Sequence, residues 1–258
     1  QRRNRPIIYY PFPYGNTIII GETMGNKFKA FTLAEVLITL GIIGIVAAMT
    51  LPVLIQKNNN RIVETRLMKF YSSINQAVKM AEADYGDKIY WWDDLTGCDF
   101  DIEGNPIEGS SQSEKWFKKY IATYMKILKI ETVKYNGSFR VYFPDGSALQ
   151  SFAHTTRDWI FYTGNPDKCN KKAQSYGICS FHFNFKPTGT QDSTIWKYHM
   201  NKGFEPWKYK WDGDIENLKK ACYKNIPLGD ATVTGKAYCT AVIQYYNWKI
   251  PDDYPYKV

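Results

Sequence analysis

The sequence predicts an α+β fold in which a long, membrane-spanning N-terminal helix packs on an antiparallel β-sheet head. Two patterns support this prediction. No ionisable side chain occurs from Val36 to Ile55, and these 20 residues are long enough for a helix to cross about 30 Å of hydrocarbon. After residue 138, short runs rich in aromatic and β-branched residues are separated by turn residues, which is typical of strands.

The net charge of +8 is unevenly distributed along the 258 residues. Five basic residues and one acidic residue precede residue 31, so half of the basic excess lies there. The rest of the chain is only weakly basic, and we therefore do not expect a nucleic-acid partner. The content of 16% aromatic and 22% charged residues excludes a disordered chain.

The apolar run agrees with three kinds of segment. One is a cleaved secretory signal, with Lys27 and Lys29 before the run and small residues at Ala47 and Ala48. Another is a plain membrane anchor. Glu35 favours a third kind, in which the charge has a function, because a signal peptide rarely has a glutamate at the head of its apolar core. An ionisable residue in a membrane segment indicates a function and requires a partner.

The stretch KFKAFTLAEVLITLGIIGIVAAMTLP (residues 27–52) resembles the N-terminal cleavage and methylation segment of type IV pilins and type II secretion pseudopilins. In that family a short basic leader is cut before a Phe, and Glu is the fifth residue of the mature chain. Counted from Phe31, that residue is Glu35, and Pro52 also agrees with the family pattern. Family members usually have Gly before the cut, whereas this sequence has Ala30. The resemblance covers residues 27–55.

The resemblance also implies a short leader, and Met24–Ala30 forms a complete one. We therefore expect translation to begin at Met24, with residues 1–23 an upstream extension that the real protein lacks. The alternative is a genuine long leader. The expected order is thus extension 1–23, leader 24–30, transmembrane and filament-core helix 31–55, amphipathic continuation 56–85, and globular head 86–258.

Helical periodicity continues beyond the apolar run. Apolar side chains recur at three- and four-residue steps on one face, at Val63, Leu67, Phe70, Tyr71, Ile74, Val78 and Ala81. Gly86 is a suitable residue to end this helix. Pro52 lies between the apolar and amphipathic halves, where it removes one backbone hydrogen bond and introduces a kink. In the family, this region can lose helical order when subunits pack into a filament.

The head is predicted to contain two further helices and several strands. A helix is expected over residues 113–130, capped by Ser113, and a short one over 213–225. Strands are expected on both sides of the Pro144-Asp145-Gly146 turn, over 158–162 and 179–185, and last over 237–250.

Five cysteines indicate disulfides if the head is exported. Two bridges among five cysteines allow fifteen arrangements, which the sequence cannot distinguish. We favour Cys169–Cys179 and Cys222–Cys239 because each pair closes a short loop, with Cys98 left over. The alternative is that all five are reduced and buried.

Signals for catalysis or cofactors are weak. His154, His182 and His199 lack any nucleophile or metal-ligand pattern, so we expect structural or surface roles. We expect no cofactor, although Asp212, Asp214 and Glu216 leave calcium open as an alternative to helix capping. Four tryptophans are expected mainly in the core, with a glycan or peptide surface as the alternative: Trp196, Trp207, Trp211 and Trp248.

The expected function is structural rather than enzymatic. The resemblance implies a minor pilin or pseudopilin of a type IV pilus or type II secretion filament, cut after Ala30 by a prepilin peptidase and methylated on Phe31. It implies as partners other pilin subunits, an assembly ATPase and an inner-membrane platform. The head would lie outside the cytoplasm, with the subunit first in the inner membrane and later in a filament. The alternative is a tip adhesin or DNA-uptake pilin whose head binds glycan or DNA.

Physical chemistry gives Glu35 a role within this expectation. In a filament, its carboxylate can pair with the charged Phe31 amine of a neighbouring subunit. A paired charge is tolerable in an apolar core, whereas an unpaired one is expensive.

Overall fold

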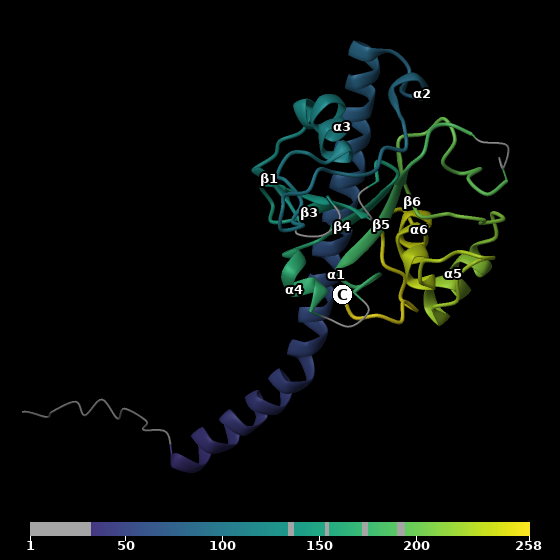
Figure 1. The fold of residues 1–258 in the computed structure, drawn as a ribbon. Helices are drawn as coiled ribbons and strands as arrows, with labels where there is room; N and C mark the ends of the chain where they lie inside the picture. Colours follow the sequence, from purple (N-terminus) through teal and green to yellow (C-terminus); the bar gives the residue numbers. More distant parts are fainter. Residues whose placement is uncertain (1–31, 134–136, 153–154, 172–174, 190–193) are drawn as a thin grey trace, which may run out of the picture. The chain divides into compact units, whose positions relative to one another are not determined.

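The computed structural model describes residues 32–133, 137–152, 155–171, 175–189 and 194–258. Over these residues the chain is α+β, with a long N-terminal helix and one antiparallel sheet, as the sequence predicts (Figure 1). The expected extension 1–23, the leader 24–30, the Ala30–Phe31 junction and His154 lie outside the described residues. By the density of contacts, the chain divides into one unit ending at Ala48 and a second comprising Met49–Val258.

Helix α1 runs without interruption from Leu33 to Tyr85 and includes Pro52. Gly86 ends it with φ of 82°, a left-handed conformation in which glycine is not strained, and its N–H donates to the Glu82 carbonyl at 3.0 Å. The buried side chains of α1 all lie in its second half: Val63, Leu67, Phe70, Ile74, Ala77, Val78 and Ala81. The amphipathic part is therefore the part of α1 that packs in the head.

Six strands form a single antiparallel sheet whose spatial order follows the chain. The strands are β1 (Lys129–Thr132), β2 (Phe139–Tyr142), β3 (Ala148–Ser151), β4 (Asp158–Tyr162), β5 (Ser180–Phe185) and β6 (Phe204–Pro206). The predicted turn at Pro144-Asp145-Gly146 joins β2 to β3, and the Gly146 N–H donates to the Phe143 carbonyl. The predicted strands over 158–162 and 179–185 correspond to β4 and β5.

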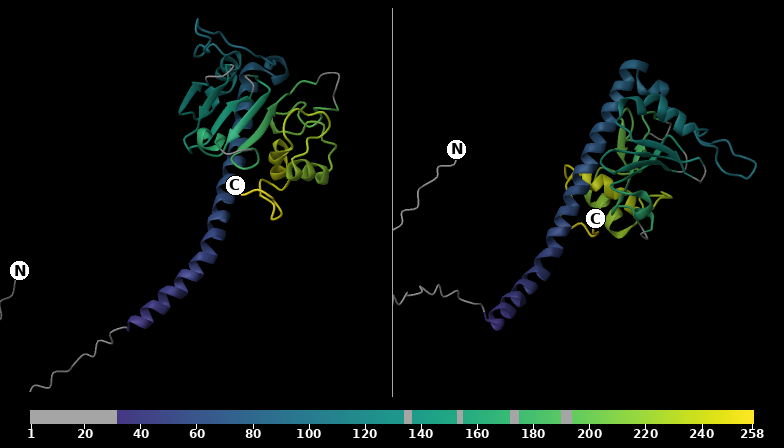
Figure 2. Two further views of the ribbon diagram at one scale, coloured as in Figure 1. Left: turned by 60° about the horizontal axis from the view of Figure 1, so that its bottom comes forward. Right: turned by 90° about the vertical axis from the view of Figure 1, so that its left-hand side faces the viewer.

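The main core lies between α1 and one face of this sheet (Figure 2). Strand side chains alternate between faces, and the inward set is mostly aromatic: Phe139, Val141, Leu149, Trp159, Phe161, Phe181, Phe183, Phe185 and Phe204. Phe70 of α1 stacks on Phe161 with ring centroids 4.3 Å apart and meets Phe183 edge-on at 5.1 Å. These contacts fix the helix against β4 and β5.

The predicted helix over 113–130 is wrong in length and in its cap. Helix α3 covers Gln112–Tyr120, followed by the 3₁₀ turn η1 (Ala122–Tyr124), and the chain then enters β1. Ser111 caps α3 by accepting from the Glu114 N–H at 3.4 Å, while Ser113 lies inside the helix. Residues 129–132 pair with β2, so the sheet hydrogen bonds end the helical pattern before residue 130.

The predicted last strand over 237–250 is also wrong. These residues form the end of the 3₁₀ turn η3 (Gly235–Tyr238) and helix α6 (Cys239–Tyr245). They pack with α5 (Ile215–Lys224) in a second core cluster that includes Leu218, Tyr238 and Val242. Two short helices complete the head, α2 (Lys88–Trp91) and α4 (Pro166–Asn170).

Candidate functional site

The first turn of α1 holds the charged group that the sequence singled out. Thr32 precedes the helix, and its hydroxyl accepts from the Glu35 N–H at 3.2 Å. In return, Oε2 of Glu35 accepts from the Thr32 N–H at 2.9 Å and from the Thr32 hydroxyl at 3.0 Å. This reciprocal pattern is a capping box, which satisfies backbone donors that the helix leaves unpaired at its N-terminus.

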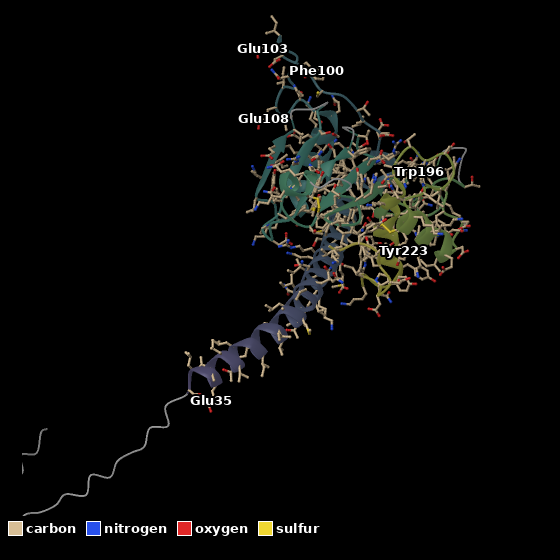
Figure 3. All side chains as sticks on the ribbon, turned by 90° about the horizontal axis from the view of Figure 1, so that it is seen from below. Glu35, Phe100, Glu103, Glu108, Trp196 and Tyr223 are labelled. Carbon is tan, nitrogen blue, oxygen red and sulfur yellow. A yellow bond between two sulfur atoms is a disulfide. The ribbon has the colours of Figure 1, made fainter. Side chains whose placement is uncertain are left out.

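Only one of the two carboxylate oxygens takes part in this box. Among the described residues, Oε1 of Glu35 accepts no hydrogen bond, and the side chain is exposed (Figure 3). The local fold therefore orients the carboxylate beside the start of the helix and leaves one oxygen available to another donor. A carboxylate in the first turn is also favoured by the helix dipole.

The surface around Glu35 is apolar on every side of the helix. Its large apolar residues are mostly half to three-quarters exposed, among them Leu33, Leu37, Leu40, Ile43 and Ile45. By length and composition, this helix is apolar enough to cross a membrane, with a mean hydropathy of 2.4 over its best 18-residue window. None of that window is buried within the described chain, which agrees with a segment that contacts lipid or other subunits.

Of the predicted processing and assembly residues, the structure describes Glu35 and Pro52. Ala30 and Phe31 lie outside the described residues, and Pro52 lies in the interior of α1 within the second unit. The capping role of Glu35 was missed in the sequence, although Thr-x-x-Glu before an apolar run is its ordinary signal.

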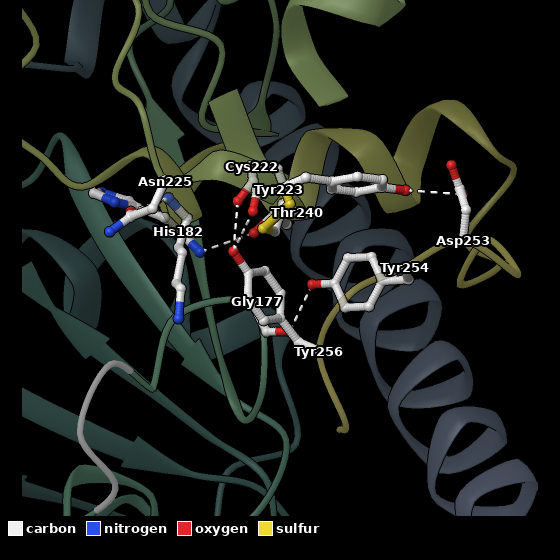
Figure 4. Close-up of a disulfide and its surroundings, with 11 residues drawn as sticks. Gly177, His182, Cys222, Tyr223, Asn225, Thr240, Asp253, Tyr254 and Tyr256 are labelled. Atoms are coloured by element: carbon white, nitrogen blue, oxygen red, sulfur yellow. Dashed lines mark hydrogen bonds between the residues drawn. A yellow bond between two sulfur atoms is a disulfide. The ribbon is translucent and has the colours of Figure 1, made fainter. Parts of the chain in front are cut away.

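Both favoured disulfides are present in the structure. Cys169 is joined to Cys179, and Cys222 to Cys239, while Cys98 is free. The second bridge ties α5 to the start of α6 (Figure 4). Next to it, the Tyr256 hydroxyl donates to the Cys222 carbonyl at 2.7 Å, so the C-terminal segment is held to the same place.

The two described histidines are both fully buried. Burial lowers the pKa of His182 to about 4 and that of His199 to about 3. The His182 ring lies 4.7 Å from the Trp207 ring, and among the described residues neither of its nitrogens has a hydrogen-bond partner. Both rings are therefore neutral at pH 7 and pack as core groups, which agrees with a structural role.

Two acidic residues near α5 accept hydrogen bonds at its N-terminus. Asp214 is the N-cap and accepts from the Glu216 N–H at 3.0 Å. Asp212 accepts from the Asp214 N–H at 2.9 Å and from the Asn217 side chain at 2.7 Å. Within the part of the chain that the structure describes, no group of three or more His, Cys, Asp or Glu side chains is placed to hold a metal ion.

The tryptophans considered for a ligand surface are mainly packing residues. Trp196 and Trp207 are buried and meet edge-on at 5.5 Å between ring centroids. Trp248 packs on Tyr71 of α1 at 4.8 Å. Trp211 donates from its indole to the Asp214 carbonyl.

Comparison with family models supports both parts of this description. Residues 25–51 match the prokaryotic N-terminal methylation motif. With the capped apolar helix and the antiparallel head, this motif defines the class of type IV pilins and pseudopilins. Residues 53–258 match a second model, and the chain belongs to that family, the family of unknown function DUF6613. No curated protein and no solved structure matches the chain.

Proposed function

We propose that the chain is a minor pilin or pseudopilin, a structural and not enzymatic subunit of a type IV pilus or type II secretion filament. The observation that carries this proposal is the methylation motif, with one capped carboxylate on the otherwise apolar first part of α1. The subunit is anchored by a single pass in the inner membrane, with its head outside the cytoplasm. An assembly ATPase and a membrane platform then move it into the filament.

Processing and assembly use the same few residues in turn. A prepilin peptidase cuts after Ala30 and methylates the new Phe31 amine. In the filament, that amine on one subunit approaches the free Oε1 of Glu35 on its neighbour. An apolar filament core makes an unpaired charge costly, and the stagger that pairs the two charges is favoured.

The N-terminus of the membrane-extracted protein tests the proposal. Intact-mass and N-terminal peptide mass spectrometry should show a chain that begins at methylated Phe31. A chain beginning after Ala48 would show that the apolar run is a cleaved secretory signal, and the filament proposal would then be abandoned.

A further inference from the structure

A loop of the head exposes apolar side chains in an acidic setting. This acidic loop comprises residues 99–108 and extends from the head (Figure 3). Phe100 is 53% exposed, Ile107 46% and Ile102 fully exposed. Four carboxylates accompany them, Asp99, Asp101, Glu103 and Glu108, and no Lys or Arg occurs between Lys88 and Lys115.

The acidic loop has a defined backbone conformation. Phe100 and Pro106 form a β-bridge, and the Ile107 N–H donates to the Asp99 carbonyl at 2.9 Å. The Asp101 carboxylate accepts from the N–H groups of Glu103 and Asn105, and these hydrogen bonds lower the pKa of Asp101. The loop therefore presents its apolar side chains in a preset arrangement, which reduces the entropy lost on binding.

A second surface of the head has the complementary character. Two depressions of about 660 and 430 Å³ share Lys69 and Asp145 and run along α1 from Asn58 to Gln76. We call them together the basic groove. Phe70, Phe143 and Met125 give it apolar walls. The turn between β2 and β3 lines the groove together with α1.

Positive charge predominates in the basic groove. Its charged lining consists of Arg61, Arg66, Lys69 and Lys126 with one acid, Asp145. Lys69 pairs with Asp145 at 3.0 Å, and Arg66 donates to the carbonyls of Asp145 and Thr163. Among the described residues, Arg61 and Lys126 have no ion-pair partner within 4.0 Å. Two cations are thus free to receive carboxylates.

We propose that the acidic loop of one subunit docks in the basic groove of a second copy of this chain. The loop supplies exposed apolar side chains and four carboxylates, and the groove supplies apolar walls and unpaired cations. The two surfaces are different parts of the head, so the contact is head-to-tail and repeats from copy to copy. Such a contact builds an open helical array wherever its rotation does not close into a ring, and a filament requires the open form. The inference rests on the proposed filament function and names one contact within it.

Cysteine cross-linking in the full-length chain, expressed with its assembly system, tests this contact. Cys98→Ser removes the free thiol, and Ile102→Cys and Ser73→Cys place one thiol on the loop tip and one in the groove. Mild oxidation should give a ladder of disulfide-linked multimers. The matched control replaces Ile102→Cys by Ile226→Cys, an apolar and 49% exposed position of the head, and should give no ladder with Ser73→Cys.

Charge reversal provides an independent readout of the same contact. In the cross-linking background, Glu103→Lys or Lys126→Glu alone should reduce the ladder about threefold, and the pair together should restore it, because an exposed ion pair contributes modestly. Asp252→Lys, an exposed acid outside the loop, should leave the ladder unchanged. A weaker ladder at higher salt is also expected.

The outcomes separate this inference from the filament proposal. Filaments with methylated Phe31 but no ladder would overturn the loop–groove contact and leave the subunit function intact. A ladder from a chain with an uncut leader would support the contact and overturn the proposed processing. If groove variants weaken binding to phosphatidylglycerol vesicles while loop variants change nothing, the groove is a lipid-headgroup site and the inference is wrong.

Discussion

Glu35 is both a helix cap and a charge, and the two roles can be separated by substitution. Glutamine can maintain a capping box but carries no charge. We expect Glu35→Gln and Glu35→Ala to insert in the membrane and to be processed, and both to lose filament incorporation by at least about tenfold because the ion pair to the neighbour's amine is gone. Shear fractions probed by immunoblot would measure incorporation.

The comparison between these two variants is decisive because only one of them lacks the cap. If Glu35→Gln assembles normally while Glu35→Ala does not, capping at Thr32 is the role of this residue and the ion pair is wrong. Thr32→Val, which removes the hydroxyl of the box and keeps the charge, is the matched control. It should reduce assembly far less than either Glu35 variant.

His182 makes the stability of the head depend on pH. Burial, the largest cause, lowers its pKa to about 4, Asp158 raises it, and Arg157 lowers it. The unfolded chain binds a proton below about pH 6.5, whereas the folded chain does not until about pH 4. The free energy of unfolding is therefore highest above pH 6.5 and falls by about 2–3 kcal/mol as the pH drops to 4.5.

Replacing His182 with Phe should flatten this pH dependence. The ring already stacks on Trp207 and lies 5.6 Å from Phe152, so an apolar ring suits the position. Urea unfolding of the detergent-solubilised chain at pH 7 and pH 4.5 would measure the difference. If stability depends on pH as strongly in the variant as in the unmodified chain, His182 does not titrate in this window. The pH dependence that persists in the variant is expected from His199, whose pKa is also lowered by burial.

At the residue level, the sequence predicted those features that have local causes. The disulfides close short loops, and Gly86 ends α1 because glycine tolerates a positive φ. The free Oε1 of Glu35 and the unpaired cations of the groove were not predictable, because they depend on which partners the folded chain brings near. The Thr32–Glu35 capping box does have a local signal in the sequence, Thr-x-x-Glu before an apolar run.

At the level of elements, Phe70 connects α1 to the sheet. Its ring is 4% exposed and contacts Phe161 of β4 and Phe183 of β5. We expect Phe70→Ala to lower the free energy of unfolding by about 3–5 kcal/mol, since it removes burial and leaves a cavity. Urea titration of the full chain in detergent, followed by tryptophan fluorescence, measures the loss.

Met80 offers a matched control on the same helix. It is 43% exposed, so Met80→Ala should change the stability by less than about 0.5 kcal/mol. Equal effects of the two substitutions would mean that α1 is not held to the sheet through the Phe70 contacts.

The elements that the sequence misassigned are those decided by tertiary contacts. Residues 237–243 are apolar and buried almost without a break, and such a run does not distinguish a buried strand from a short buried helix. Here the Cys222–Cys239 bridge and the packing on α5 favour the helix. In residues 113–130 the helical pattern continues to Leu128, but pairing of 129–132 with β2 determines the structure.

For the whole molecule, two modules meet near one proline. The methylation motif ends at residue 51 and the head family begins at residue 53, so only Pro52 lies between the two matches. The compact units divide close by, between Ala48 and Met49. The N-terminal segment that matches the methylation motif and the head are thus separate both in the families they match and in the compact units they form. They can therefore be tested separately.

The thiol state of the five cysteines reports where the head resides. If the head is exported, its two disulfides form and only Cys98 stays reduced. A polyethylene-glycol maleimide added to the acid-trapped, denatured protein should then give one adduct before reduction and five after it. A variant lacking residues 24–55 stays in the reducing cytoplasm and should give five adducts without reduction. Cys98→Ser in the exported chain should give none before reduction and four after it. Five adducts on the unreduced full-length chain would place the head in the cytoplasm and contradict the proposed topology.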